Sequence, residues 1–187
     1  MSLKESTDED LLLRYAGGEA AAFDLLYKRY NGLLFRFVLR HCSDSSVVEE
    51  LYQDIWVKLI NSKDRYEVKA KFSTYLFHIA RNRITDHFRQ QGHRKILTSL
   101  DFDSENIPAK ARTLPAAQPD GQAIVKSEIK QLVSLVEQLP EVQREAFLLR
   151  EEAGMSVEEI AEVTGVARET AKSRLRYAVQ SLRSQLQ

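Results

Sequence analysis

Cationic side chains gather on one face of the last predicted helix, which spans about 168–185. A short helix starting at Ser156 and the turn Thr164–Val166 precede it, and Gly165 in that turn can take a positive φ. A short helix, a glycine turn and a basic second helix are typical of a helix-turn-helix that reads duplex DNA in the major groove. We predict this motif from about Pro140 to Leu186, with these duplex-contacting candidates: Arg168, Glu169, Lys172, Ser173, Arg174 and Arg176.

Local signals support each part of this motif. Pro140 suits the first turn of a helix, where its missing amide costs nothing, and Gly154 is a predicted helix end. Ser156 and Glu159 have the spacing of a capping box. The alternative is a helical hairpin with a solvated basic face. Acidic residues are nearly absent from 170–183, which a merely solvated face would not require.

Basic and aromatic residues interleave through residues 63–95. Unpaired bases stack on aromatic rings while cations follow the phosphates, so such a stretch suits single-stranded DNA better than a duplex groove. The alternative is that individual rings, Phe72 and Tyr75 among them, belong to the core. The candidate strand contacts are Arg65, Lys69, Lys71, Phe72, Ser73, Thr74, Tyr75, His78, Asn82 and Arg83.

The elements that would position these residues are all helical, because apolar residues recur at helical spacing and no alternating strand pattern is evident. Before residue 95 we predict four helices that pack as one bundle, and the fourth starts near Ser73 as its N-cap. Three of the four prolines lie in 100–122, which indicates a linker. The predicted fold is all-α, with two helical domains, 1–95 and 122–187, joined by a linker at 96–121.

Composition excludes several classes of protein. The chain has 27 basic and 27 acidic residues, yet residues 60–95 hold nine basic and three acidic ones, net +6. Residues 165–183 hold five basic and one acidic residue, net +4, so two basic patches can follow phosphate in a neutral protein. We expect no membrane insertion, because no run approaches about 20 apolar residues. The single Cys42 fits a cytoplasmic location. No zinc or calcium spacing and no catalytic grouping is evident, so we expect no metal, no cofactor and no enzymatic activity.

Three motifs, in order and spacing, resemble the extracytoplasmic-function (ECF, group IV) sigma factors of bacterial RNA polymerase, within the sigma-70 family. Glu49–Leu59 (EELYQDIWVKL) is similar to the family's region 2.2, and Phe72–Asn82 (FSTYLFHIARN) to regions 2.3 and 2.4. Leu139-Pro140, followed by a helix-turn-helix that ends in Thr170–Leu175 (TAKSRL), is similar to region 4.

The resemblance implies a role for each part. The first domain would be the region 2 domain, which binds core polymerase, and melts and recognises the −10 element. The second would be the region 4 domain, which reads the −35 element. The implied partners are core RNA polymerase (its β′ clamp helices and β flap), promoter DNA and an anti-sigma factor. The implied response is to stress or an extracytoplasmic signal. The implied polymerase contacts are Glu49, Glu50, Gln53, Asp54 and Trp56.

Other functions remain as alternatives. A stand-alone helix-turn-helix regulator would bind operator duplex as a dimer without polymerase. That function leaves the acidic patch at residues 49–54 and the aromatic-basic stretch at 63–95 unexplained. An enzyme acting on nucleic acid would need a metal cluster or paired carboxylates on ordered elements. A helical adaptor would show no preference for DNA.

Overall fold

The computed structural model describes residues 3–42, 44–90 and 123–186, and for 123–130 it describes the backbone alone. The described part is helical and contains no strand, which confirms the all-α prediction. Short 3₁₀ turns lie at Leu3–Glu5 (η1) and Lys63–Arg65 (η2). The helices are α1 (Asp8–Ala16), α2 (Ala20–His41), α3 (Ser45–Ser62), α4 (Phe72–Gln90), α5 (Ala123–Gln138), α6 (Glu141–Glu151), α7 (Val157–Thr164) and α8 (Arg168–Gln185).

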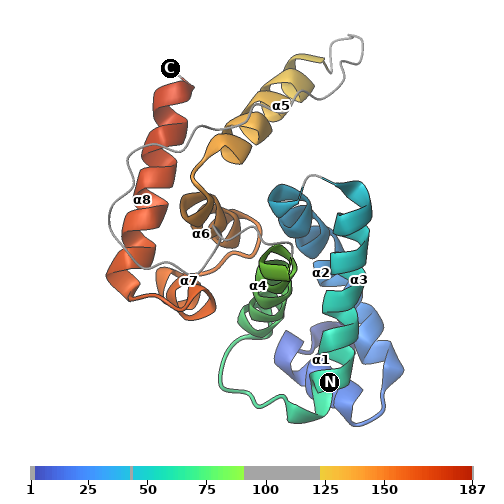
Figure 1. Cartoon of the computed structure of the whole chain (residues 1–187). Helices are drawn as coiled ribbons and strands as arrows, with labels where there is room; N and C mark the ends of the chain where they lie inside the picture. The colour runs from blue at the N-terminus through green and yellow to red at the C-terminus, as the bar shows by residue number, and fades with distance from the viewer. Residues whose placement is uncertain (1–2, 43, 91–122, 187) are drawn as a thin grey trace.

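Helices α1 to α4 pack as the predicted bundle, in which α1 is the shortest member (Figure 1). One apolar stripe of α3 faces inward, and its members Leu51, Ile55 and Leu59 have no exposed surface. Phe37 of α2 meets Phe77 of α4 edge to face, with ring centroids 5.1 Å apart. Such a pair adds about 0.5–1.5 kcal/mol beyond the area it buries. The aromatic packing therefore ties α4, which carries most of the predicted strand contacts, to the bundle.

The start of α4 differs from the prediction. The helix begins at Phe72, so Ser73 lies inside it and is not its N-cap. The Phe72 amide donates to Glu9 Oε1 of α1 at 2.7 Å, and the Phe72 ring packs edge-on to Tyr30, 5.0 Å away. A side chain distant in sequence thus caps the helix, and a carboxylate at this end also suits the helix dipole. Local spacing could not have revealed this cap.

The helix-turn-helix has the predicted local structure. Pro140 is the N-cap of α6, and Ser156 and Glu159 form the capping box of α7, with both hydrogen bonds present. Gly165 ends α7 with φ 68°, in the left-handed region. Its amide and that of Val166 bond back to carbonyls of α7, which turns the chain into α8. Gly154 takes a positive φ of 64°, although α6 ends three residues earlier at Glu151.

The two groups of helices touch. In Figure 1, α4 (green) lies between α3 and the pair α6 and α7, and α4 packs directly against α7. The predicted linker at 96–121 lies outside the described residues. Among the described helices, none combines the length and apolar character needed to cross a membrane.

Candidate nucleic-acid and polymerase interfaces

The loop before α4 and the first turns of α4 form a surface with exposed cations. Arg65, Lys69 and Lys71 are exposed in the loop, and His78 and Asn82 are exposed along α4. Asn82 Nδ2 lies 3.2 Å from His78 Nδ1, so these two predicted contacts form one polar pair. We call this surface, from Arg65 to Asn82, the strand face.

A hollow of about 220 Å³ opens on the strand face. The rings of Tyr66 and Tyr75 lie beside it with centroids 5.1 Å apart, and Tyr75 donates a hydrogen bond to Ser62 Oγ at 2.8 Å. Burial raises the pKa of Tyr66 to about 12, helped by Glu9 nearby, so its phenol stays neutral at physiological pH. The hollow has room for a flat group between apolar ring edges and polar side chains. Its lining residues are Tyr66, Glu67, Lys69, Ala70, Thr74, Tyr75, His78 and Glu162.

Three predicted strand contacts are not free on this surface. Phe72 is fully buried and Thr74 is 3% exposed, so both belong to the core beneath it. The Thr74 hydroxyl has no hydrogen-bond partner among the described residues, although it borders the hollow. Arg83 points to α3, where its guanidinium bonds Asp54 at 2.6 Å and Glu50 at 3.3 Å. Phe72 is therefore the core aromatic that the sequence left as an alternative.

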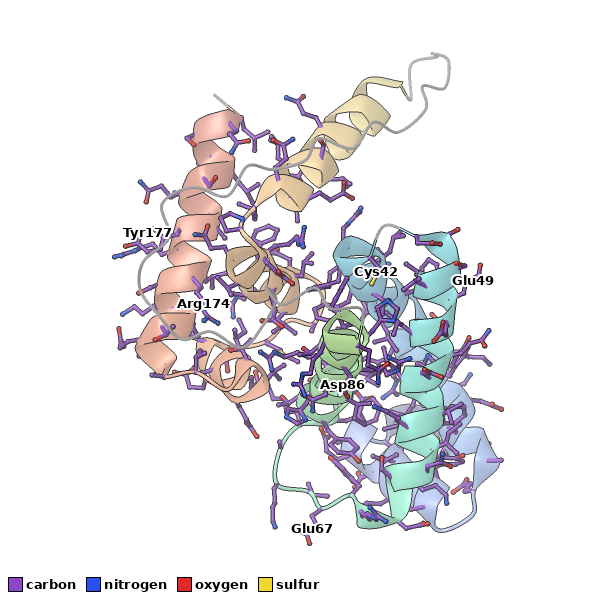
Figure 2. The ribbon with its side chains drawn as sticks, viewed as in Figure 1. Cys42, Glu49, Glu67, Asp86, Arg174 and Tyr177 are labelled. Carbon is purple, nitrogen blue, oxygen red and sulfur yellow. The ribbon has the colours of Figure 1, made fainter. Side chains whose placement is uncertain are left out.

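The predicted polymerase contacts lie along α3. Glu49, Glu50 and Gln53 are exposed, whereas Trp56 is buried against Phe23 and Tyr27. Figure 2 labels Glu49 on α3 at the side of the molecule away from α8. The exposed acids and the partly exposed Asp54 form one edge, and Trp56 lies in the core behind it.

Helix α8 presents most of its predicted contacts to solvent. Arg168, Glu169 and Lys172 are exposed near its start. Arg168 pairs with Glu158 of α7 and, at 3.0 Å, with Glu169. Arg176 is exposed and lies over the Tyr177 ring, 5.0 Å from its centroid. These contacts hold long cationic side chains in place before any DNA is bound.

Arg174 is half-buried, whereas the other predicted cationic contacts of α8 are exposed: Arg168, Lys172 and Arg176. Figure 2 labels it and Tyr177 on the same helix. Burial lowers the pKa of the Arg174 guanidinium, Arg81 of α4 lowers it further, and Glu145 of α6 opposes both. Arg174 therefore lies within the electrostatic reach of both groups of helices.

Four residues that line the hollow were not among the predicted contacts: Tyr66, Glu67, Ala70 and Glu162. Tyr66 stood in the aromatic-basic stretch but was not selected, although its ring forms one wall of the hollow. Glu162 lies on α7, about 90 residues away, and borders the same hollow. No local signal could have pointed to Glu162, because only tertiary packing brings α7 to this surface.

Comparison with known proteins gives a match in each of the two groups of helices. Residues 26–94 match the family model of sigma-70 region 2, and residues 129–182 match that of sigma-70 region 4. The chain is 27% identical to the RNA polymerase sigma-H factor of Pseudomonas aeruginosa, over 99% of this chain and 96% of that one. It is 29% identical to the ECF RNA polymerase sigma-E factor of Escherichia coli, over 98% and 96%.

Two solved structures share the fold. CnrH in complex with the cytosolic domain of CnrY has a TM-score of 0.68 at 22% identity, covering 97% of both chains. The sigma factor RpoE in complex with the anti-sigma factor NepR from Bartonella quintana has a TM-score of 0.64 at 24% identity, covering 88% of this chain and 96% of that one.

The fold and its surfaces define a two-part helical protein of transcription initiation. The chain belongs to the sigma-70 family, as a sigma factor of the ECF type. It therefore binds core RNA polymerase and directs it to promoters, and it is not an enzyme. This assignment sets aside the stand-alone regulator, the nucleic-acid enzyme and the adaptor.

Proposed function

We propose that the strand face reads and holds the non-template strand of the −10 element once it is unpaired. The observation that carries this proposal is the hollow, where two tyrosine rings lie beside the exposed Lys69 and His78. Stacking of one unpaired base on an aromatic side chain contributes roughly 1–3 kcal/mol. Opening one duplex step loses about 1.4 kcal/mol on average. One or two captured bases can therefore hold open a bubble that polymerase has started.

Within this surface we assign different tasks to the predicted residues. Tyr75, with Tyr66 beside it, supplies the ring surface for a base, and Lys69, Lys71 and Arg65 accompany the phosphates. His78 and Asn82 are placed to meet base edges or phosphates. The buried or paired residues Phe72, Thr74 and Arg83 support this surface from below, and the partly exposed Ser73 lies beside them in the first turn of α4.

In the second part of the chain, α8 enters the major groove of the −35 element. Arg168 and Lys172 lie near its N-terminal end, the part of a recognition helix that contacts base edges. Glu169 and Ser173 lie on the same turns, and Arg174 and Arg176 follow. We assign Arg176 chiefly to the phosphates, because it lies farther along the helix and over a tyrosine ring.

The acidic edge of α3 docks on the β′ clamp helices of the polymerase, and region 4 docks on the β flap. The contacts assigned to the clamp are Glu49, Glu50, Gln53 and Asp54, with Trp56 holding their helix in the bundle. The domains are 1–95 and 122–187, with a linker at 96–121. We place the protein in the cytoplasm, in a stress or extracytoplasmic-signal response under an anti-sigma factor. The solved relatives bound to CnrY and NepR support that last assignment.

Run-off transcription with purified core polymerase and a genomic promoter library tests the proposal as a whole. We expect transcripts that require both core and this chain and that share −10 and −35 elements. Tight duplex binding without core, and no change in transcripts when the chain is added to core, would contradict it.

The clamp assignment has its own test. Glu49→Lys with Glu50→Lys should abolish co-purification with core, because the charge reversal repels the surface that these acids contact. Asp54 is left unchanged, because at 2.6 Å it makes the closer contact with Arg83 and keeps that link between α3 and α4 when Glu50, the outer partner at 3.3 Å, is reversed. The matched control is Asp10→Lys with Glu151→Lys, two exposed acids on other helices. If core binds both double variants with wild-type affinity, the clamp contact lies elsewhere.

A further inference from the structure

The surface that packs against the strand face is acidic. Residues 60–95 have net charge +6, while residues 137–162 hold eight acidic and two basic residues, net −6. Helices α6 and α7 lie in this acidic segment, and α7 packs against α4. The described part of the first segment, residues 60–90, holds seven basic and three acidic residues, net +4, so the two segments attract each other across the boundary between the domains.

Four ion pairs cross this boundary with the same polarity. In each, the cation belongs to the N-terminal helices or the loop before α4, and the carboxylate belongs to the C-terminal helices. The pairs are Arg36–Glu152 at 2.8 Å, Arg40–Glu137 at 3.2 Å, Lys71–Glu159 at 3.1 Å and Arg81–Glu145 at 2.9 Å.

Two carboxylates of α7 lie on the strand face itself. Glu159 takes the Lys71 ammonium, and Glu162 borders the hollow formed by Tyr66 and Tyr75. A strand that followed the exposed cations would bring its phosphates to Lys71 and past this hollow. The carboxylates of α7 therefore occupy positions where the strand would place negative charge.

The ion pair between Arg81 of α4 and Glu145 of α6 fixes the relative position of the two domains. Glu145 is 1% exposed and Arg81 13%, so the contact is almost dry. Burial raises the pKa of Glu145, and the guanidinium of Arg81 opposes that rise. A buried charge that loses its partner is strongly unfavourable. The pair therefore favours this packing over neighbouring ones, whereas the exposed pairs contribute mainly attraction.

We propose that α7 is an internal substitute for DNA: in the free chain Glu159 pairs with Lys71 and Glu162 lies at the hollow, so that the −10 strand binds the strand face tightly only after the two domains separate. The proposal rests on the proposed strand-binding role of that face. The occupant is the chain's own acidic segment, and the competitor is the phosphate backbone of a single strand. Before separation, one carboxylate of α7 is paired with Lys71 and another lies at the hollow.

Binding of a single strand to the full-length free chain tests this proposal. The probe is a fluorescein-labelled oligothymidylate of about 20 nucleotides, long enough to cover a single-strand site, followed by anisotropy at low ionic strength. The opening variant is Glu145→Gln with Glu159→Gln. Its matched control is Glu151→Gln with Asp24→Asn, which removes the same charge at exposed positions away from the strand face and from α8. Small-angle scattering measures the radius of gyration of every variant.

We expect the opening variant to expand and to bind the probe at least tenfold more tightly than wild type, with little change in the control. Adding Lys71→Ala to the opening variant should reverse most of the gain, because the strand then loses a cation of the strand face. A milder variant, Glu152→Gln with Glu159→Gln, keeps the buried pair and should change in the same direction by less. It replaces the opening variant if Glu145→Gln lowers the unfolding midpoint.

Three results would overturn the proposal, and they have different meanings. If the control gains as much affinity as the opening variant, net charge alone explains the effect. If the opening variant expands without binding the probe better, the domains do close, but the strand face is not the DNA site and that part of the proposed function fails too. If the opening variant neither expands nor gains affinity, α7 does not compete with the strand and this proposal fails. The run-off experiment then still decides the proposed function.

Discussion

At the scale of single residues, two aromatic rings near the strand face differ in whether an unpaired base can reach them. Tyr75 is partly exposed beside the hollow, whereas Phe72, three residues earlier, is fully buried. Tyr75→Ala and Lys71→Ala should leave closed-complex formation nearly intact and slow open-complex formation, because each removes a contact made only to the unpaired strand. Permanganate footprinting of unpaired thymines measures this rate.

A pre-melted promoter supplies the control for that experiment. It should restore both variants, because the step that they slow has already occurred. Melting of the native promoter at the wild-type rate would show that this surface does not hold the strand.

His41 is a buried titratable group at the boundary between the domains. Its Nδ1 donates to the Phe37 carbonyl at 2.7 Å, and Nε2 is buried with no partner among the described residues. Burial lowers the pKa of His41 to about 4, Arg144 of α6 and Arg81 of α4 lower it further, and the Phe37 bond opposes them. The folded protein therefore holds the ring neutral where an unfolded chain would bind a proton.

Stability should respond to acid accordingly. Since the folded pKa lies below the unfolded one, the contribution of His41 is complete above about pH 6.5 and is lost as pH falls towards 4. We expect wild type to lose on the order of 3 kcal/mol of unfolding free energy by pH 4 relative to His41→Phe, which has no proton to bind. Denaturant unfolding of both proteins across this range measures the difference.

The comparison of the two proteins is needed because Glu141 has the opposite trend. Burial raises the pKa of Glu141 to about 7, Glu145 raises it further and Arg144 opposes them, so Glu141 alone makes the protein less stable as pH rises from about 4.5 to 7. Parallel curves for wild type and His41→Phe would show that the ring takes up no proton on unfolding.

At the −35 end, Arg174 and Arg176 can each act in one of two ways, by reading a base or by contacting a phosphate. An arginine that reads guanine contributes about 1–3 kcal/mol of discrimination, whereas a phosphate contact weakens binding at every sequence. Either alanine variant should lower transcription at cognate promoters roughly tenfold or more, consistent with the loss of such a contact. Promoters changed at the −35 guanines, transcribed by each variant, show which side chain specifies bases. Full activity of both variants would remove α8 from the reading role.

At the scale of elements, the turn between α7 and α8 depends on one backbone conformation. A Cβ built on Gly165 meets nothing within 4 Å, so a substitution there is opposed only by the positive φ of 68°. Gly165→Ala should therefore lower the unfolding free energy by about 1–2 kcal/mol, the penalty of a left-handed alanine. Gly165→Asn should lose less, because asparagine tolerates this region better. Chemical denaturation of the three proteins compares them, and equal stability would mean that the turn relaxes to another conformation.

How far sequence reasoning reached also differs between elements. The helix-turn-helix was predictable because its signals are local: Ser156 and Glu159 lie one turn apart, and Gly165 stands at a helix end. The start of α4 was not, because Glu9 caps it from another helix. Arg83 was predicted as a DNA contact from its position on the helix, yet its partners are on α3. Local spacing determines the face of a helix but not the neighbour that the face meets.

At the scale of the whole molecule, both DNA-reading elements are linked to the boundary between the domains. Lys71 of the strand face pairs with α7, and the half-buried Arg174 of α8 lies near Arg81 and Glu145. The family and the two-domain order could be read from motifs, whereas the packing of one half on the other could not. No motif encodes it, because the charges that cross the boundary come from segments at least 64 residues apart.

The nearly dry contact between Arg81 and Glu145 has a consequence for temperature. Hydration of charged groups carries a strongly negative entropy, so withdrawing them from water becomes less unfavourable on warming, while the gain from burying apolar surface levels off. A boundary held by such a pair should therefore tighten relative to the apolar cores as the protein is heated and loosen as it is cooled. Relative to the apolar core of each half, this contact should therefore contribute least in the cold and most near the melting temperature.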